Sequence, residues 1–242
     1  MKHGFLDKYS NLKSPLHTLD PRPKVLFTLG LVFTIAWLPV GLWSLYVVAF
    51  AIVVAEVLIS RVPFTYVTLR ATAVLPFSLL IGSMRFLLEG EGALPFVLSL
   101  SAKAWLSAMA LLALISTTPF PVLLQGLEAL GFPKVLVQVL AFMYRYIFVI
   151  LDEAMRMKRA WDSRGGGRKW WISFKAMAQI VGVLFIRSYE RSERVYQAMC
   201  SRGFDGRTRT INPFHFGLSE MVFSSVSGTS IVVLWTLWSL WS

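Results

Sequence analysis

Two copies of a short pattern, each ending in Arg-Gly, hold the residues of this chain best suited to grip a partner. They stand 38 residues apart and read Asp162-Ser163-Arg164-Gly165 and Cys200-Ser201-Arg202-Gly203. Glycine ends helices readily because it adopts the left-handed backbone conformation without a steric cost. The preceding arginine then stands at a helix tip, where its planar guanidinium offers five donors to a carboxylate or to backbone carbonyls. The repeat therefore predicts two docking tips, although each copy alone is also typical of an ordinary helix cap.

The composition indicates that these tips belong to a membrane protein. Of the 242 residues, 56% are hydrophobic and 15% are charged, and the mean hydropathy is +0.62, which is typical of chains that cross the bilayer several times. The net charge is +11, and residues 152–210 hold 13 of the 24 Lys and Arg but 6 of the 13 Asp and Glu. A basic excess beside membrane spans marks the cytoplasmic face. Topology thus accounts for the charge, and we expect no nucleic acid as a partner.

Five apolar runs predict five membrane-spanning helices. They cover residues 25–38, 42–59, 74–88 (with a start as early as Tyr66), 93–116 and 218–241. Pro39 and Gly41 separate the first two runs into a tight hairpin. Three tryptophans near the end of the last run would form an interfacial aromatic belt; they are Trp235, Trp238 and Trp241. The prediction is an all-α integral membrane protein with four N-terminal spans in residues 1–118, a helical coupling segment in 119–212, and a last span in 213–242.

The charge pattern also orients the chain. Basic residues before the first run, between the second and third runs and in 152–210 place these segments inside, and Glu89 and Glu91 place their loop outside. Five spans put Ser242 outside. The first 24 residues carry five Lys and Arg without a long apolar run, so we expect no cleavable signal peptide. Residues 135–151 are apolar but contain Arg145, and we favour a helix lying along the membrane over a sixth span.

The residues needed for several kinds of chemistry are missing from the sequence. Gly165-Gly166-Gly167-Arg168-Lys169 lacks the Lys-Ser/Thr of a phosphate-binding loop, so we expect neither ATP hydrolysis nor a bound cofactor. The histidines and the single cysteine are too scattered for a metal site; they are His3, His17, His215 and Cys200. Three charges within apolar runs could line a transport path, or could instead pair or reach a membrane surface; they are Glu56, Arg85 and Lys103.

Three segments resemble the transmembrane T component of energy-coupling factor transporters, and within it the cobalt branch, CbiQ. They are residues 14–24 (SPLHTLDPRPK), 144–146 (YRY) and 187–206 (RSYERSERVYQAMCSRGFDG). The two Ala-Arg-Gly motifs of that family correspond to Ser163-Arg164-Gly165 and Ser201-Arg202-Gly203, with serine in place of alanine.

The resemblance implies a non-catalytic subunit of a cell-membrane importer. Arg164 and Arg202 would end two crossed cytoplasmic helices, and each would dock into a groove on one of two ATPase subunits (CbiO-like). A separate membrane subunit (CbiM-like, together with a CbiN-like protein in some systems) would hold the substrate. The implied cargo is cobalt, with nickel and then a vitamin as rivals. From the residues alone, a self-sufficient ion channel or carrier stays an alternative.

Overall fold

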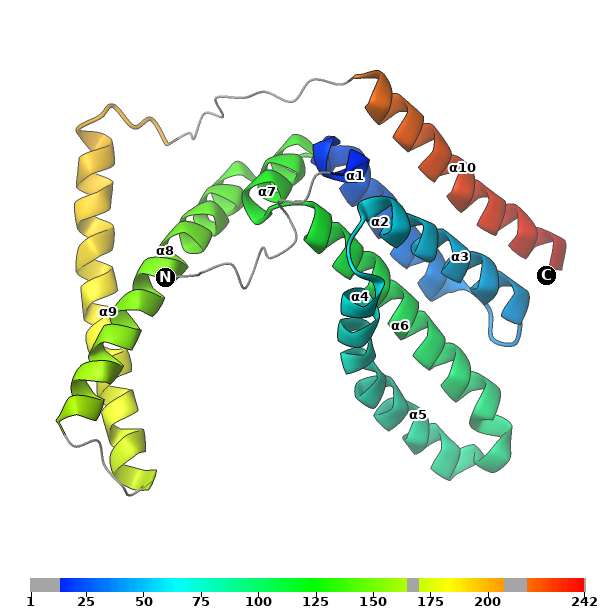
Figure 1. Ribbon diagram of the computed structural model, residues 1–242, viewed down its shortest axis with the longest axis horizontal. Helices are drawn as coiled ribbons and strands as arrows, with labels where there is room; N and C mark the ends of the chain where they lie inside the picture. Colours follow the sequence, from blue (N-terminus) through cyan, green and yellow to red (C-terminus); the bar gives the residue numbers. More distant parts are fainter. Residues whose placement is uncertain (1–13, 165–169, 207–216, 242) are drawn as a thin grey trace. The chain divides into compact units, whose positions relative to one another are not determined.

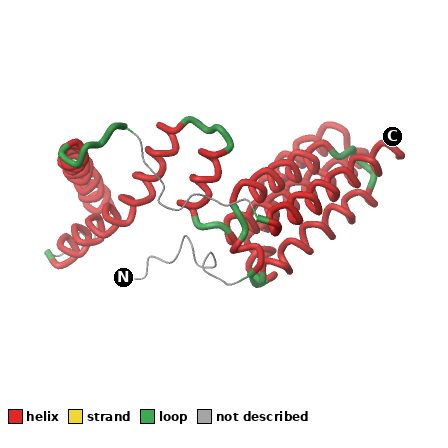
Figure 2. Tube along the Cα trace, turned by 90° about the horizontal axis from the view of Figure 1, so that it is seen from above, coloured by secondary structure: helices red, strands yellow, loops and turns green. Residues whose placement is uncertain are grey.

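The computed structural model describes residues 14–164, 170–206 and 217–241, and every regular element in these ranges is a helix (Figure 2). The contacts between residues divide the chain into two compact units. One consists of Met1–Gly131 with Pro213–Ser242, and the other is Phe132–Asn212. The predicted all-α membrane architecture is confirmed.

The first unit is a bundle of helices (Figure 1). Its α-helices, joined in two places by the short 3-10 turns η1 (Thr72–Val74) and η2 (Gly90–Ala93), are α1 (Pro15–Thr18), α2 (Pro21–Trp37), α3 (Trp43–Ser60), α4 (Phe64–Ala71), α5 (Leu75–Glu89), α6 (Leu94–Thr117), α7 (Phe120–Ala129) and α10 (Leu218–Trp241). The second unit contains α8 (Lys134–Ser163) and α9 (Trp170–Cys200), which pack against each other.

Helix α2 lies at the centre of the first unit and packs against α6, α7 and α10. Its Leu31 and Ile35 are fully buried, and its Phe27 meets Phe223 of α10 edge to face, with ring centroids 5.8 Å apart. Small residues such as Ala110 of α6 are also fully buried. In a bilayer the lipid is as apolar as these side chains, so close packing at small residues, rather than exclusion from water, holds such helices together.

Helix α7 packs on α2 at a position where only a glycine fits. A β-carbon at Gly126 would lie 2.9 Å from Cβ and Cγ of Pro21. Pro21 stands in the first turn of α2, where its missing N–H costs nothing. The structure therefore groups α7 with the first unit, whereas the sequence places residues 119–131 at the start of the coupling segment.

The helices long enough to cross a membrane only partly coincide with the five predicted runs. Among the described residues, five segments have the required length and apolar composition: Trp43–Ser60, Phe64–Leu87, Leu94–Thr117, Lys134–Ser163 and Glu220–Ser239. The first predicted run is not among them, because α2 has 17 residues and a length of about 25 Å. The fourth segment is α8, which the sequence favours as a helix along the membrane.

The close approach of α7 to α2 generates a stability prediction. We expect Gly126→Ala to lower the midpoint of thermal unfolding, because overpacking a tight contact costs about 1–3 kcal/mol. Gly228→Ala in α10 is the matched control, because no atom lies within 4 Å of its β-carbon position. The control should unfold at the wild-type temperature or slightly above it, since alanine favours helix over glycine. Equal midpoints for both variants in detergent would contradict the tight α2–α7 contact.

Candidate partner-docking site

The end of α9 is closed by a glycine cap that places Arg202 at the helix tip. Gly203 has φ +78°, in the left-handed region. Its N–H donates to the carbonyl of Cys200 at 3.0 Å, and the N–H of Phe204 donates to the carbonyl of Met199 at 3.1 Å. These two bonds form a Schellman motif, which satisfies carbonyls that the helix end leaves without partners. The side chain of Arg202 is exposed, so the helix end predicted for the second copy is present.

The first copy ends α8 in a comparable way as far as it is described. The N–H of Arg164 donates to the carbonyl of Trp161 at 3.1 Å, and the Arg164 side chain is exposed. Gly165, for which a left-handed cap is predicted, lies outside the described residues. The structure therefore describes Arg164 at the helix end and leaves the cap itself a prediction.

The serines of the two copies make the same local bond. The hydroxyl of Ser163 donates to the carbonyl of Ala160 at 3.0 Å, and that of Ser201 donates to the carbonyl of Ala198 at 3.0 Å. Each serine hydroxyl thus donates its proton within its own helix, and the following arginine is left as the exposed donor. The repeat is consequently longer than the sequence analysis recognised, because alanine precedes serine by three residues in both copies.

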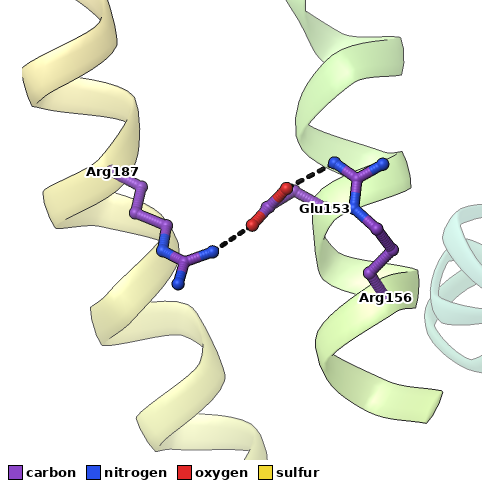
Figure 3. Close-up of polar contacts among 3 residues, drawn as sticks. All are labelled: Glu153, Arg156 and Arg187. Carbon is purple, nitrogen blue, oxygen red and sulfur yellow. Dashed lines mark hydrogen bonds and ion pairs between the residues drawn. The ribbon is translucent and has the colours of Figure 1, made fainter. Parts of the chain in front are cut away.

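One carboxylate joins the two long helices. Glu153 of α8 accepts hydrogen bonds from Arg156, one turn along the same helix, and from Arg187 of α9 (Figure 3). Within α9, a guanidinium nitrogen of Arg194 lies 3.9 Å from a carboxylate oxygen of Glu190 and forms an ion pair with it. The sequence analysis assigned no role to Glu153. The spacing of Glu153 and Arg156 signals a pair within one helix, but a contact 34 residues away leaves no local trace.

An apolar groove runs between the same two helices. It has a volume of about 220 Å³ and is lined by Phe142, Tyr146 and Ile150 of α8 and by Val195 and Met199 of α9, among others. Tyr146 belongs to the Tyr-Arg-Tyr segment singled out from the sequence. Met199 also accepts a bond of the Arg202 cap. The groove and the second tip are therefore parts of one surface of this unit.

The only cysteine in the chain lies beside that tip. Cys200 is exposed and stands one helical turn after Tyr196. The neighbouring Cys200 thiol raises the pKa of the Tyr196 phenol above its ordinary value. The exposed thiol directly precedes Ser201 in the chain and is a natural site for chemical labelling of this helix end.

The three charges of the apolar runs do not come together in the first unit. Lys103 donates from Nζ to the carbonyl of Ala36 at 3.0 Å, and the Arg85 guanidinium lies 4.0 Å from the ring centroid of Phe96. Glu56 lines a cavity that includes Phe27. Phe27 and Ala36 are nine residues apart on α2, or about 14 Å along its axis. Within the described residues, no group of three His, Cys, Asp or Glu side chains could hold a metal ion.

Residues 12–211 match the protein family described as CbiQ, cobalt transport protein. The chain is 31% identical over 128 residues to an uncharacterized protein of Methanocaldococcus jannaschii, covering 51% of this chain and 47% of that one. It is 33% identical over 90 residues to a putative fused cobalt transport protein, CbiMQ, of Methanocorpusculum labreanum, covering 37% and 15%. It thus spans less than half the length of either relative. Over 265 aligned residues it is 28% identical to the energy-coupling factor transporter transmembrane protein EcfT of Heliobacterium modesticaldum, covering 97% and 98%.

The cap of α9 generates a local prediction. Gly203→Ala should loosen the helix end, because a left-handed alanine costs roughly 1–2 kcal/mol, and the amides of Gly203 and Phe204 should exchange with solvent about five- to thirtyfold faster. Gly203→Asn is the control, since asparagine tolerates this conformation better. Hydrogen exchange of residues 196–206 measures the difference. Unchanged exchange in the alanine variant would show that the cap does not fix the position of Arg202.

Proposed function

Since the chain belongs to the CbiQ family, the transmembrane T component of energy-coupling factor transporters, we propose that this multi-pass membrane protein is the scaffold that couples two ATPases to a substrate-binding subunit. The observation that carries the proposal is the repeated tip. Arg164 and Arg202 both end a long helix of the second unit, are both exposed, and both follow a serine bonded to its own helix. A guanidinium so presented suits a charge-assisted bond to a partner.

The substrate proposed for the complex is the cobalt ion, held by a separate membrane subunit. The family description names cobalt transport, and a relative's name describes a fusion of two cobalt transport components in one chain. The same scaffold role in nickel or vitamin uptake is the alternative. We propose that this subunit is non-catalytic, with ATP hydrolysis in its CbiO-like partners and substrate capture in a CbiM-like partner.

A channel or carrier that works alone is the rival from another class. It would need Glu56, Arg85 and Lys103 along one path, and the described contacts separate them. Ion flux into liposomes containing only this chain distinguishes the two functions. Flux at the rate of the full complex would favour the rival.

Orientation generates the first prediction of the coupling proposal. If residues 152–210 face the cytoplasm, a membrane-impermeant thiol reagent added to intact cells should leave Cys200 unlabelled. Permeabilised cells that produce the chain without its ATPase partners should label it fully. If α8 crossed the membrane instead, both arginine tips would lie outside and Cys200 would react in intact cells. A second variant, Cys200→Ser with Ser242→Cys, tests the other end. Its labelling from outside supports five spans, whereas protection supports six.

The docking tips generate the second prediction. Arg164→Glu combined with Arg202→Glu should abolish uptake and release the ATPases while leaving the chain folded in the membrane. A hydrogen bond to a charged group is worth about 1.5–3 kcal/mol, so loss of one weakens docking about ten- to a hundredfold, and charge reversal adds repulsion. Co-purification of the ATPases and cobalt uptake are the two measurements.

The control for the docking test reverses the same amount of charge elsewhere on the same unit. Arg159→Glu with Lys175→Glu changes two exposed basic residues, four residues before the end of α8 and five residues after the start of α9. This control should leave ATPase capture within about twofold of wild type, as expected for screened surface charges. If the tip variant captures ATPases as well as wild type and still transports, the tips are ordinary helix caps. If both variants fail equally, general surface charge and not the tips holds the ATPases.

A further inference from the structure

A buried carboxylate in the first unit has no role in the coupling proposal. Glu56 lies in α3, four residues before the helix ends at Ser60. Its Oε2 atom is buried, and among the described residues no group donates a hydrogen bond to it. An unpartnered acid at membrane depth is costly, and such groups mark functional sites. This acid therefore needs a partner that the described protein residues do not supply.

Glu56 lines a cavity of about 210 Å³ between α1, α2, α3 and α10. A water molecule in the liquid takes roughly 30 Å³, so the cavity holds more than a single bridging water. Most of its lining is apolar, and two lining residues, Ile59 and Val226, are 53% and 64% exposed. The cavity is thus open to an apolar outer surface, which in a membrane protein faces lipid chains.

The other polar groups in the lining are serine hydroxyls whose protons are already donated to backbone carbonyls. Ser227 donates to the carbonyl of Ser224 at 3.1 Å, and Ser230 donates to the carbonyl of Ser227 at 2.7 Å. Both oxygens keep lone pairs that can accept. With Glu56 ionised, the cavity presents acceptors only: a carboxylate and two hydroxyl oxygens. A primary ammonium group, with one positive charge and three N–H donors, complements this set.

The same three acceptor groups argue against a metal ion and against a quaternary amine as the ligand. One carboxylate with two hydroxyls in an apolar lining is a poor match for a divalent cation, which takes about six oxygen ligands. A trimethylammonium group carries the charge but has no N–H to donate. Glu56 lies about 6 Å from the end of α3, which is near the depth of lipid headgroups.

We propose that the cavity at Glu56 binds the ammonium headgroup of an aminophospholipid, phosphatidylethanolamine, with the carboxylate and the hydroxyls of Ser227 and Ser230 as acceptors. The acyl chains would lie against the apolar surface beside Ile59 and Val226. The site belongs to the first unit and does not depend on the docking of ATPases.

The test measures lipid retention by the purified full-length chain. The protein is taken from nanodiscs that contain equal amounts of phosphatidylethanolamine and phosphatidylcholine with identical acyl chains, and native mass spectrometry gives the ratio of the two bound lipids. The wild type should retain phosphatidylethanolamine about tenfold over phosphatidylcholine, as expected for one charge-assisted bond. Stepwise N-methylation of the headgroup should lower retention in steps as donors are lost. Equal retention of both lipids by the wild type would overturn the proposal.

Two variants and one control assign the preference to this cavity. Glu56→Gln should remove it, to a ratio of about twofold or less, since the neutral amide keeps the size of the side chain but lacks the charge. Ser230→Ala, which removes one acceptor, should reduce the preference for phosphatidylethanolamine in part. This variant is the alternative test if Glu56→Gln does not fold. Ser225→Ala in the same helix is the control, because Ser225 does not line the cavity and should keep the wild-type ratio. A full preference in both Glu56→Gln and Ser230→Ala would refute the site. The docking variant with reversed Arg164 and Arg202 should keep the preference, so failure of either proposal is recognised separately.

Discussion

Every helix end in this protein must satisfy carbonyls that no longer have a partner within the helix, and in a chain built for lipid this requirement is strict. The structure meets it outside the apolar bundle with a left-handed glycine. At Gly203 two backbone bonds close the end of α9 and fix the direction in which the chain leaves. The position of Arg202 follows from that closure. The side chain that we propose as a docking group is thus placed by the requirement that backbone groups be paired.

The two units rely on different kinds of contact. The first is held by close packing around α2, where Leu31 and Ile35 are fully enclosed and Gly126 admits Pro21. The second has only α8 and α9, and Glu153 bridges them across an apolar groove. Few of its side chains are buried, and many large apolar ones, such as Met143 and Phe185, stay exposed. Such surface is expected to meet lipid or protein partners, which agrees with a proposed coupling role for this unit and a proposed scaffold role for the other.

Local patterns in the sequence predicted the features that depend on residues close together in the chain, which are the helices and one helix end. The apolar runs predicted the helices, and glycine after Arg202 predicted the end of α9. The contacts of α7 with α2 and of Glu153 with Arg187 were missed, because they join residues far apart in the chain and leave no periodic signal. The limits of the spans were only partly predictable. Helix α2 begins at Pro21, and its 17 residues are too few for a full crossing of the membrane. Helix α8, in contrast, is long and apolar enough to be a candidate membrane span.

The bridge at Glu153 divides α8 into unequal arms. Glu153 stands 11 residues from Arg164 and 19 residues from Lys134, which correspond to about 16 Å and 29 Å of helix. A rigid rod turning about that point moves its longer arm nearly twice as far as its shorter one. If the bridge acts as a fulcrum, a small displacement of Arg164 becomes a larger displacement at the opposite end of α8. The single carboxylate would then hold α8 and α9 together and also set the ratio between the displacements of the two ends of α8.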